Sequence, residues 1–315
     1  MITFDDIYDS LLKLGLKKKD TVLIFSSLAS MGRLEGAEDK NSFCSIYYRA
    51  IQKIIGDDGT IVVPSYTSQV GRFGVPFVLE STPSLTGIFA EYIRKKKNSI
   101  RSIHPLNSLS AIGPKKEFIC TNNSTSAFGW DSPFHRMDSV DTKILSLGLS
   151  SAYVMANSHY IEAMTGLPYV YNKLLDVQAE VKGKILKNFY TCSARHLNID
   201  IEYDYTRWGN ILFNMKKIAG IRLGRSYAFM TNYRDIIDVA RKNIINNPFF
   251  FLKNKPQFIL GEIPFDGSTA SREKSNMLQN NNKDINWGSY YLGHMVTNIN
   301  EDFNDKIVNK NISLN

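Results

Sequence analysis

Two residues within positions 143–171 have types and a spacing that suit acid–base chemistry. His159 and Glu162 stand three positions apart, and on a helix this spacing places both side chains on one face, within contact distance. A helix amino terminus disfavours a charged imidazole, whereas a neighbouring carboxylate favours one, so the pair predicts a histidine that can take and hold a proton. Such a dyad can deprotonate an amine or a hydroxyl group. The same spacing also fits a structural role for both residues, at the cap and in the first turn of the helix.

A strand, a loop and a helix must position this pair. Residues 143–149 alternate small and apolar side chains and run into Gly148, which predicts a buried strand that ends in a loop. Asn157 and Ser158 are favourable helix caps, and Gly166 ends the helix that they begin. We therefore expect the dyad in the first turn of a helix that follows a buried strand.

A second predicted strand leads into a loop of small residues. Residues 21–25 are β-branched and apolar, and a helix is predicted over residues 41–55. The loop residues of interest are Ser26, Ser27, Ser30, Met31 and Gly32. Backbone N–H groups and hydroxyls in such a loop can bind an anion, so we interpret it as a candidate pyrophosphate cradle. A plain turn is the alternative, because the glycines of a known nucleotide-binding fingerprint are absent.

Polar residues also follow the next predicted strand, residues 59–64. Tyr66 and Thr67 lie just past its carboxyl end, where open α/β sheets commonly line a ligand crevice, and we take them as substrate-binding candidates. Arg101 could pair with a phosphate through its planar guanidinium. His104, which precedes a proline, is a third candidate for the substrate site or else a structural hydrogen-bonding residue.

The pattern of elements favours an α/β fold. Short strands alternate with helices through residue 175, which predicts a largely parallel sheet. Residues 65–74 read as a loop, and residues 177–190 as a hairpin. Further on, helices are predicted over residues 204–219 and 233–246, and a pair of strands over residues 220–230.

The last fifty residues lose this pattern. From about residue 268 the chain is rich in Asn, Ser and Lys, which predicts a polar tail that is partly docked or disordered. We therefore expect a catalytic domain over residues 1–265 and a tail over residues 266–315. Aromatic clusters at residues 249–251 and 287–291 could pack on the chain's own body or in a homodimer.

Composition excludes several classes of protein. No run approaches the roughly 18 apolar residues of a membrane span, and the amino-terminal segment is acidic where a signal peptide would be basic, so a cytoplasmic location is expected. The three cysteines, Cys44, Cys120 and Cys192, have no spacing that would suit a metal site, and we expect buried thiols and no metal. The formal charge of +8 could attract a polyanion such as a nucleotide or coenzyme A. No nucleic-acid-binding motif accompanies this charge.

Several motifs together resemble one family. In chain order they are FSSLASMG, GTIVVPSYT, TPSLTGIFAEYIR, RSIHPLNSLSAIG, GWDSPFHRM, KILSLGL and HYIEAMTGLPY, with weaker likeness in VKGKIL, LGRSYAFM and NNPFFFL. This ordered set, which covers roughly residues 1–252, is similar to the aminoglycoside 3-N-acetyltransferase-like family.

The resemblance implies an acyltransferase that uses acetyl coenzyme A as co-substrate and needs no metal. Its fold would be three-layered, α/β/α, with a central mixed and largely parallel sheet, unrelated to the commoner acetyltransferase superfamily. By position, His159 is the general base for the acceptor amine and Glu162 orients it. The family elements that line the coenzyme site correspond to Ser26, Ser27, Ser30, Met31, Gly32, Arg101, Ser102 and Ser108.

Charge and two departures from the family pattern bear on the acceptor. Phe25 stands where the family often has a histidine, and Met155-Ala156 where it often has Asn-Thr. Aminoglycosides are polycations that a chain of net charge +8 would tend to repel. We therefore expect an anionic amino sugar, such as a nucleotide-linked amino-deoxysugar destined for a bacterial surface glycan. The alternatives are an aminoglycoside 3-N-acetyltransferase and a relative that binds coenzyme A without catalysis.

Overall fold

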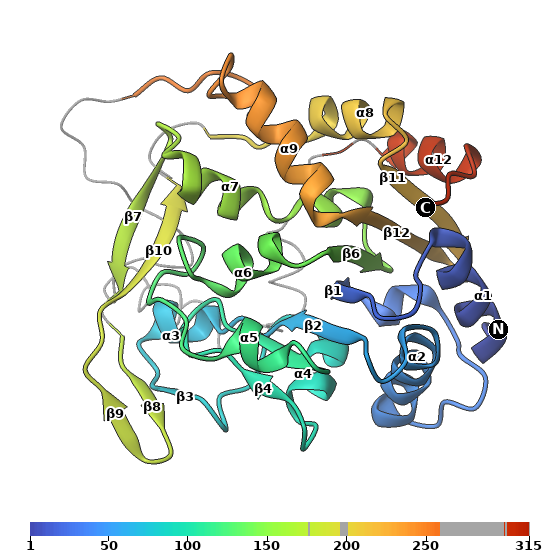
Figure 1. Cartoon of the computed structure of the whole chain (residues 1–315), viewed down its shortest axis with the longest axis horizontal. Helices are drawn as coiled ribbons and strands as arrows, with labels where there is room; N and C mark the ends of the chain where they lie inside the picture. The colour runs from blue at the N-terminus through green and yellow to red at the C-terminus, as the bar shows by residue number, and fades with distance from the viewer. Residues whose placement is uncertain (176, 196–200, 259–298, 300, 315) are drawn as a thin grey trace, which may run out of the picture.

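A seven-stranded sheet forms the middle layer of the computed structural model, which describes residues 1–175, 177–195, 201–258, 299 and 301–314 (Figure 1). Its strands are β1 (Thr21–Ser26), β2 (Thr60–Pro64), β4 (Ile100–Arg101), β5 (Leu109–Ile112), β6 (Thr142–Leu147), β11 (Ile218–Leu223) and β12 (Ser226–Asn232). Their order across the sheet is β11-β12-β6-β1-β2-β5-β4. The three central strands β6, β1 and β2 are parallel, and the outer pairings are antiparallel. The predicted mixed α/β sheet is confirmed.

Helices cover both faces of this sheet. One face carries α1 (Phe4–Leu14), α2 (Lys40–Ile55) and α4 (Ile88–Arg94). The other carries α5 (Lys116–Cys120), α6 (Pro133–Ser139), α7 (Ser158–Thr165), α8 (Thr206–Asn214), α9 (Tyr233–Ile244) and α12 (Glu301–Asn309). Side chains alternate between the two faces along each strand, so Val22 and Ile24 join one core while Leu23 and Phe25 join the other. Every residue of β1 and of β6 is buried, as expected for strands covered on both faces.

Two small sheets extend from this body (Figure 1). Their strands are β7 (Val170–Leu175) with β10 (Tyr190–Arg195), and β3 (Phe77–Val78) with β8 (Ala179–Val181) and β9 (Lys184–Leu186). The β8–β9 hairpin turns at Lys182 and Gly183, both of which have a positive φ. The hairpin predicted over residues 177–190 is therefore present, as is the predicted strand pair β11–β12.

Two expectations from the sequence were wrong. The stretch read as a loop at residues 65–74 contains a short helix, α3 (Ser68–Phe73), which Gly74 ends in the left-handed conformation. The helix predicted over residues 204–219 ends at Asn214, because Lys216 has a φ of 58° and the apolar residues from Ile218 onward pair with β12 instead. In both places the end of a helix depends on a single turn residue or on pairing with another strand. Local composition shows neither of these.

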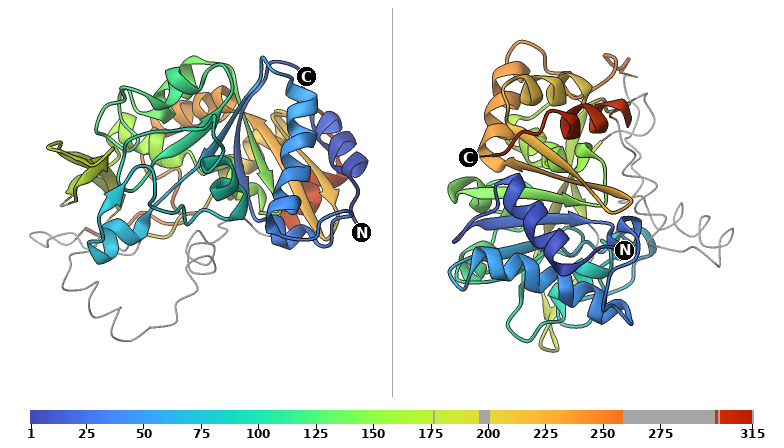
Figure 2. Two further views of the ribbon diagram at one scale, coloured as in Figure 1. Left: turned by 90° about the horizontal axis from the view of Figure 1, so that it is seen from below. Right: turned by 90° about the vertical axis from the view of Figure 1, so that its right-hand side faces the viewer.

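The two ends of the described chain lie on the same side of the molecule (Figures 1 and 2). The Leu314 N–H donates to the Leu14 carbonyl at 3.3 Å. Phe303 and Ile307 of α12 are buried in the core beside Gly209 and Gly220. The part of the predicted tail that is described therefore packs on the body, while the aromatic cluster at 287–291 lies outside the described residues.

The other aromatic cluster belongs to the chain's own core. Phe250 and Phe251 are buried, and the Phe251 ring packs on Trp208 at 4.8 Å between centroids. Cys44, Cys120 and Cys192 are buried thiols, as expected. Within the described ranges, no helix combines the length and apolar character that crossing a bilayer would require.

A buried ion pair joins the amino ends of the two central strands. The Lys143 ammonium at the start of β6 lies 2.8 Å from the Asp20 carboxylate just before β1, and both side chains are under 10% exposed. Lys143 also donates to the Gly15 carbonyl at 2.6 Å, and Asp20 accepts from the Lys17 N–H at 2.8 Å. The pair thus fixes β1 against β6 at the end opposite to the loops of interest.

Replacing one partner should destabilise the fold strongly. Lys143→Met leaves a buried carboxylate without its counter-charge, and we expect a loss of about 3–5 kcal/mol in the free energy of unfolding, measured in urea. The double variant Lys143→Met with Asp20→Leu removes both charges and should recover most of that loss. A single variant that stays within about 1 kcal/mol of the wild type would show that the pair is not required.

Candidate active site

The predicted dyad is formed in the structure. His159 lies in the first turn of α7, and its Nδ1 is 2.7 Å from Oε2 of Glu162. The Glu162 side chain is fully buried, whereas the His159 side chain is 41% exposed. In a neutral imidazole, the nitrogen that faces a carboxylate carries the proton, so Nδ1–H donates and Nε2 keeps its lone pair. Nε2 is therefore the nitrogen that can accept a proton from a ligand.

Tyr169 completes the shell of the buried carboxylate. Its hydroxyl donates to Oε1 of Glu162 at 3.2 Å, so each carboxylate oxygen has a partner. Burial and the nearby Glu162 charge raise the pKa of Tyr169 well above its ordinary value, which keeps the phenol a neutral donor. A buried carboxylate without such partners would cost several kcal/mol or would take up a proton.

Aromatic rings hold the imidazole in place. The ring of Phe128 lies 5.6 Å from that of His159, and Tyr203 meets the imidazole edge-on at 5.9 Å. Tyr205, next to Tyr203, shares a 2.7 Å hydrogen bond with the Ser158 hydroxyl. Burial, with the Glu162 charge as a further cause, raises the pKa of both tyrosines, so neither competes with His159 as a base near neutral pH.

The sheet topology puts this dyad at the place where α/β proteins commonly bind ligands. The chain passes from β1 to β2 on one side, whereas β6 pairs with β1 on the other side. The carboxyl ends of β1 and β6 are therefore a topological switch point, the kind of place where open α/β sheets commonly bind ligands. The β1 loop continues toward α2, and the β6 loop continues into α7 with His159.

These two loops touch directly. The Ser30 hydroxyl donates to the carbonyls of Ser27 at 2.7 Å and Gly148 at 2.5 Å, and the Ser27 N–H donates to the Leu147 carbonyl at 2.8 Å. A side chain at Gly148 has no room, because a Cβ there would lie 2.3 Å from the Ser27 carbonyl oxygen. Gly148 also has a φ of 72°, which favours glycine. The predicted cradle loop and the loop that leads to the dyad thus form one unit.

The cradle loop offers backbone rather than side-chain donors. Residues 28–31 form a 3-10 helix whose hydroxyl at Ser30 is engaged as described, and Ser26 is buried in β1. Gly32 follows Met31 with a φ of 101°, which favours glycine. An anion at this loop would therefore be bound through backbone N–H groups rather than through hydroxyls.

The other predicted coenzyme residues are committed elsewhere. The Arg101 guanidinium is buried and donates to Ser108 Oγ and to three carbonyls, those of Ser65, Leu79 and Thr82. Ser108 donates in turn to the Ser65 carbonyl at 2.7 Å. Ser102 accepts from the Leu109 N–H at 2.9 Å. The polar atoms of Arg101, Ser102 and Ser108 thus form an internal network that ties β2 and β5 to the loop before α4, and contact of these side chains with the coenzyme stays a prediction.

The predicted substrate residues are also buried. Thr67 donates to the Pro105 carbonyl, and Tyr66 belongs to the apolar core, where burial raises its pKa. The Nδ1 of His104 accepts from the N–H groups of Leu106 and Asn107, and its Nε2 lies 3.2 Å from the Thr191 carbonyl. These contacts fit the structural role that the sequence context offered for His104, and its part in substrate binding stays a prediction.

The departures from the family pattern have a packing explanation. Phe25 is buried with its ring 6.4 Å from that of Tyr153, and Met155 is fully buried. Both positions serve the core here.

The sequence reasoning missed Tyr169, because α7 ends at Gly166 and helical spacing from Glu162 does not extend to a residue in the next loop. Within the described ranges, no group of His, Cys, Asp and Glu is arranged to hold a metal ion.

Comparison with known proteins identifies a family. The family model described as Aminoglycoside 3-N-acetyltransferase matches residues 23–244. Aminoglycoside N(3)-acetyltransferase III of Salmonella sp is 27% identical over 188 residues, which are 53% of this chain and 63% of the relative. The SPbeta prophage-derived aminoglycoside N(3')-acetyltransferase-like protein YokD of Bacillus subtilis (strain 168) is 29% identical over 168 residues, 46% of this chain and 60% of YokD. The matches thus span less than two thirds of these relatives.

Solved structures share the fold at lower sequence identity. AAC-IIIb in a binary complex with CoASH superposes with a TM-score of 0.65 and 16% identity, covering 81% of this chain and 99% of the other. AAC-VIa bound to sisomicin gives a TM-score of 0.63 and 19% identity, covering 77% of this chain and 97% of the other. These likenesses establish that the three-layer fold is the one seen in those proteins.

The buried His104 predicts a specific pH dependence of stability. Burial lowers its pKa to about 4 from an ordinary value of 6.5. Between these two pH values the folded state binds fewer protons than the unfolded state. The stability that a neutral, buried His104 contributes is therefore complete above pH 6.5 and is lost as the pH falls toward 4. We expect wild-type protein to lose about 3 kcal/mol more than His104→Gln over that interval in urea unfolding. Parallel curves for the two proteins would contradict a neutral, buried His104.

Proposed function

Because the chain belongs to the aminoglycoside 3-N-acetyltransferase family, we propose that it is an N-acetyltransferase that moves an acetyl group from acetyl-CoA to an amine of an amino sugar. His159 is the general base and Glu162 the residue that orients it. The observation that carries this proposal is the 2.7 Å contact between a half-exposed imidazole and a fully buried carboxylate at the switch point of the sheet.

The dyad geometry fits the proton transfer that this reaction needs. An amine is mostly protonated in water and attacks a thioester only after losing a proton. Nε2 of His159 takes the proton from the attacking nitrogen as the C–N bond forms, and Glu162 stabilises the resulting imidazolium. As the C–S bond breaks, His159 returns that proton to the leaving thiolate. The products are then the amide and the free thiol, with His159 neutral again.

The cradle loop is the proposed site for the coenzyme. Its backbone lies against Gly148 at the start of the loop that leads to His159, so an acyl group held there would be near the base. Backbone N–H groups of this loop are the proposed donors for the oxyanion that develops on the acyl carbonyl or for a phosphate. The shared fold with a relative solved with CoASH supports this placement.

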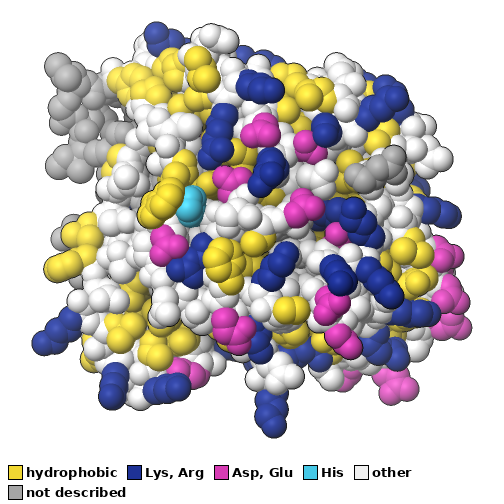
Figure 3. All heavy atoms as spheres, in the orientation of Figure 1, with side chains coloured by type: hydrophobic (Ala, Val, Ile, Leu, Met, Phe, Trp, Pro, Cys, Tyr) yellow, Lys and Arg dark blue, Asp and Glu magenta, His cyan; other side chains and the backbone are white. Residues whose placement is uncertain are grey.

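Family membership favours an aminoglycoside as the acceptor. The two curated relatives are named as an aminoglycoside acetyltransferase and a protein like one, and a structural neighbour was solved with sisomicin. The expected repulsion from the net charge of +8 is weaker than the total suggests. On the face shown in Figure 3, Lys and Arg side chains are dispersed, with Asp and Glu side chains between them. The proposed acceptor is therefore an aminoglycoside-like polyamine sugar.

A nucleotide-linked amino-deoxysugar is the second candidate acceptor. The observation in its favour is the net charge of +8, which would attract a nucleotide diphosphate more readily than a polycation. A catalytically inactive, coenzyme-binding relative is the third alternative. The intact dyad argues against this alternative. Burying a carboxylate is costly even when both of its oxygens accept hydrogen bonds, so a role in orienting His159 explains Glu162 better than a role in core packing does.

Substitutions in the dyad should abolish turnover without preventing folding. For His159→Ala and Glu162→Gln we expect kcat to fall roughly 100- to 10,000-fold, the usual contribution of a positioned base. The measurement is thiol release from acetyl-CoA with a panel of amines, and thermal unfolding checks the fold. His135→Ala is a matched control, since His135 lies on α6 and packs on the exposed Trp130. Unchanged kcat in His159→Ala would rule out His159 as the base.

The same assay separates the candidate acceptors. We expect kanamycin-like aminoglycosides to be acetylated with a higher kcat/KM than nucleotide-linked amino sugars, because the relatives of this chain carry that name. A preference for nucleotide-linked amino sugars by tenfold or more would instead establish the second candidate. Coenzyme binding without turnover on any amine would support the inactive alternative.

A further inference from the structure

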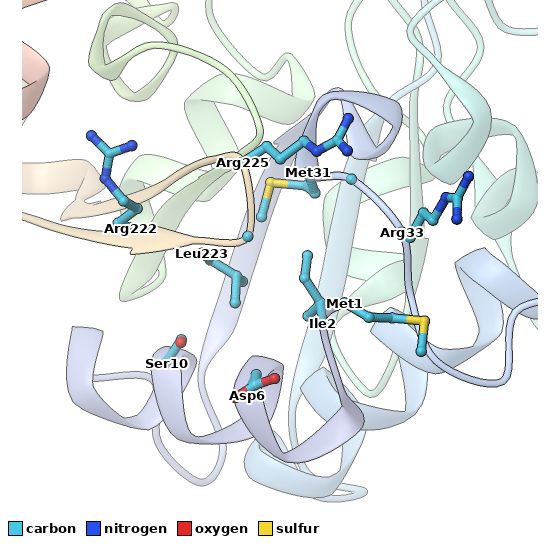
Figure 4. Close-up of a pocket in the computed structure, with 11 residues that line it drawn as sticks. Met1, Ile2, Asp6, Ser10, Met31, Arg33, Arg222, Leu223 and Arg225 are labelled. Atoms are coloured by element: carbon cyan, nitrogen blue, oxygen red, sulfur yellow. The ribbon is translucent and has the colours of Figure 1, made fainter.

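A hollow of about 710 Å³ lies beside the cradle loop (Figure 4). Met31 and Gly32 of that loop line it, together with Arg33 and with Arg222 and Arg225 of the β11–β12 hairpin. In Figure 4 Arg225 and Arg33 lie on either side of Met31, and Arg222 lies farther along the hairpin. Three guanidinium groups thus lie around one concave surface, next to the loop that is proposed to bind an anion.

The hairpin turn is fixed against the cradle loop by the backbone. The Arg225 N–H donates to the Met31 carbonyl at 2.9 Å, and a Cβ at Gly224 would lie 2.3 Å from the same oxygen. The Arg225 side chain lies across Gly32, with its Cγ and Cδ 3.3 Å from where a Cβ would stand. Because β12 runs antiparallel to β6, this turn is at the carboxyl edge of the parallel strands. The hollow therefore opens on the same edge of the sheet as the proposed coenzyme site.

Two of the three guanidinium groups are available to a ligand. Arg222 is paired with Asp305 at 3.0 Å and lies within 3.2 Å of the Tyr227 hydroxyl. The guanidinium groups of Arg33 and Arg225, by contrast, make no hydrogen bond or ion pair with any residue in the described part of the chain. Both side chains are exposed. Arginine presents its donors in a planar fork that matches two phosphate oxygens.

The acidic residue of the hollow does not cancel these charges. Asp6 lines the wall, but its carboxylate accepts from the N–H and hydroxyl of Thr3 at 2.8 and 2.9 Å, in the capping box of α1. These hydrogen bonds lower the pKa of Asp6, so it is ionised and already engaged at a helix amino terminus. The rest of the lining is uncharged in its side chains and includes Ile2, Ser10 and Leu223. The free charge of the hollow is positive.

We propose that Arg33 and Arg225 bind the phosphate groups at the nucleotide end of the acyl coenzyme. This inference rests on the proposed function, which supplies the coenzyme. The thioester end must reach His159 on α7, which covers one face of the sheet, whereas Ile2, Met31 and Leu223 at the hollow belong to the core of the opposite face. The nucleotide end of a coenzyme that crosses the cradle loop would therefore lie at the hollow. The coenzyme carries a pyrophosphate and a 3′-phosphate, whereas an aminoglycoside acceptor is a polycation that two free arginines would repel.

The direct test measures binding without turnover. Adenosine 3′,5′-bisphosphate is titrated by calorimetry into the full chain and into Arg33→Gln, Arg225→Gln and the double variant. The backbone bonds of both positions survive these substitutions, and Arg234→Gln on α9 is the control because it removes an exposed arginine outside the hollow. For the double variant we expect affinity to fall about 10- to 100-fold, with Arg234→Gln unchanged.

Kinetics provide the second arm. In the double variant the KM for acetyl-CoA should rise by a similar factor with kcat unchanged, and the rise should be smaller for acetyl-dephospho-CoA, which lacks the 3′-phosphate. Bisphosphate affinity equal to that of the wild type, or lowered equally in Arg234→Gln, would overturn the inference. The inference would also be overturned if the double variant lost affinity for uridine diphosphate but not for adenosine 3′,5′-bisphosphate. That result would assign the arginines to a nucleotide-linked acceptor.

The two proposals can fail separately. If the protein acetylates no amine but loses bisphosphate affinity only when Arg33 and Arg225 are replaced, the arginine site stands and the transfer activity does not. If it acetylates amines with the same KM for acetyl-CoA in wild type and double variant, the activity stands and the arginine site is overturned.

Discussion

The buried carboxylate of Glu162 is the constraint on which the site depends. A carboxylate with no exposed surface is stable only when its oxygens are bonded, and here His159 and Tyr169 take one oxygen each. Because Glu162 cannot move toward solvent, its hydrogen bond keeps the proton of neutral His159 on Nδ1. Nε2 then keeps a lone pair that can accept a proton. The rings of Phe128 and Tyr203 pack against the imidazole and restrict its rotation. The orientation of the proposed base thus follows from the free-energy cost of burying the Glu162 carboxylate without hydrogen-bond partners.

The sheet brings the proposed acyl donor to this base. β1 and β6 are bound at their amino ends by the Lys143–Asp20 pair, and at their carboxyl ends by the contact of Ser30 with Gly148. Between these two points the strands are buried on both faces, so their loops have little freedom to separate. The β11–β12 hairpin adds a third loop to the same edge through the bond of Arg225 to Met31. Loops at one edge of the sheet therefore carry the proposed base, the cradle loop and the two arginines of the hollow.

Local patterns in the sequence were sufficient to predict the central strands and the dyad. Buried strands such as β1 and β6 have continuous apolar runs, and the dyad lies within two turns of one helix, where spacing determines contact. The internal hydrogen bonds of Arg101 were not predicted, because a guanidinium beside hydroxyls looks the same in sequence whether it faces a phosphate or a set of carbonyls. Tyr169 and Arg225 were missed because each reaches its partner across a turn or from a distant strand. Contacts between segments far apart in the chain leave no local signal.

The most direct measurement of this account is the tautomer of His159. In protein labelled with ¹⁵N at histidine, long-range ¹H–¹⁵N correlations distinguish a protonated Nδ1 from a protonated Nε2, and His159→Gln identifies the signal among the five histidines. If Glu162 orients the base, neutral His159 is protonated at Nδ1, and this preference is lost in Glu162→Ala. A neutral His159 protonated at Nε2 in the wild type would contradict the account, because the nitrogen that faces the ligand would then be unable to accept a proton.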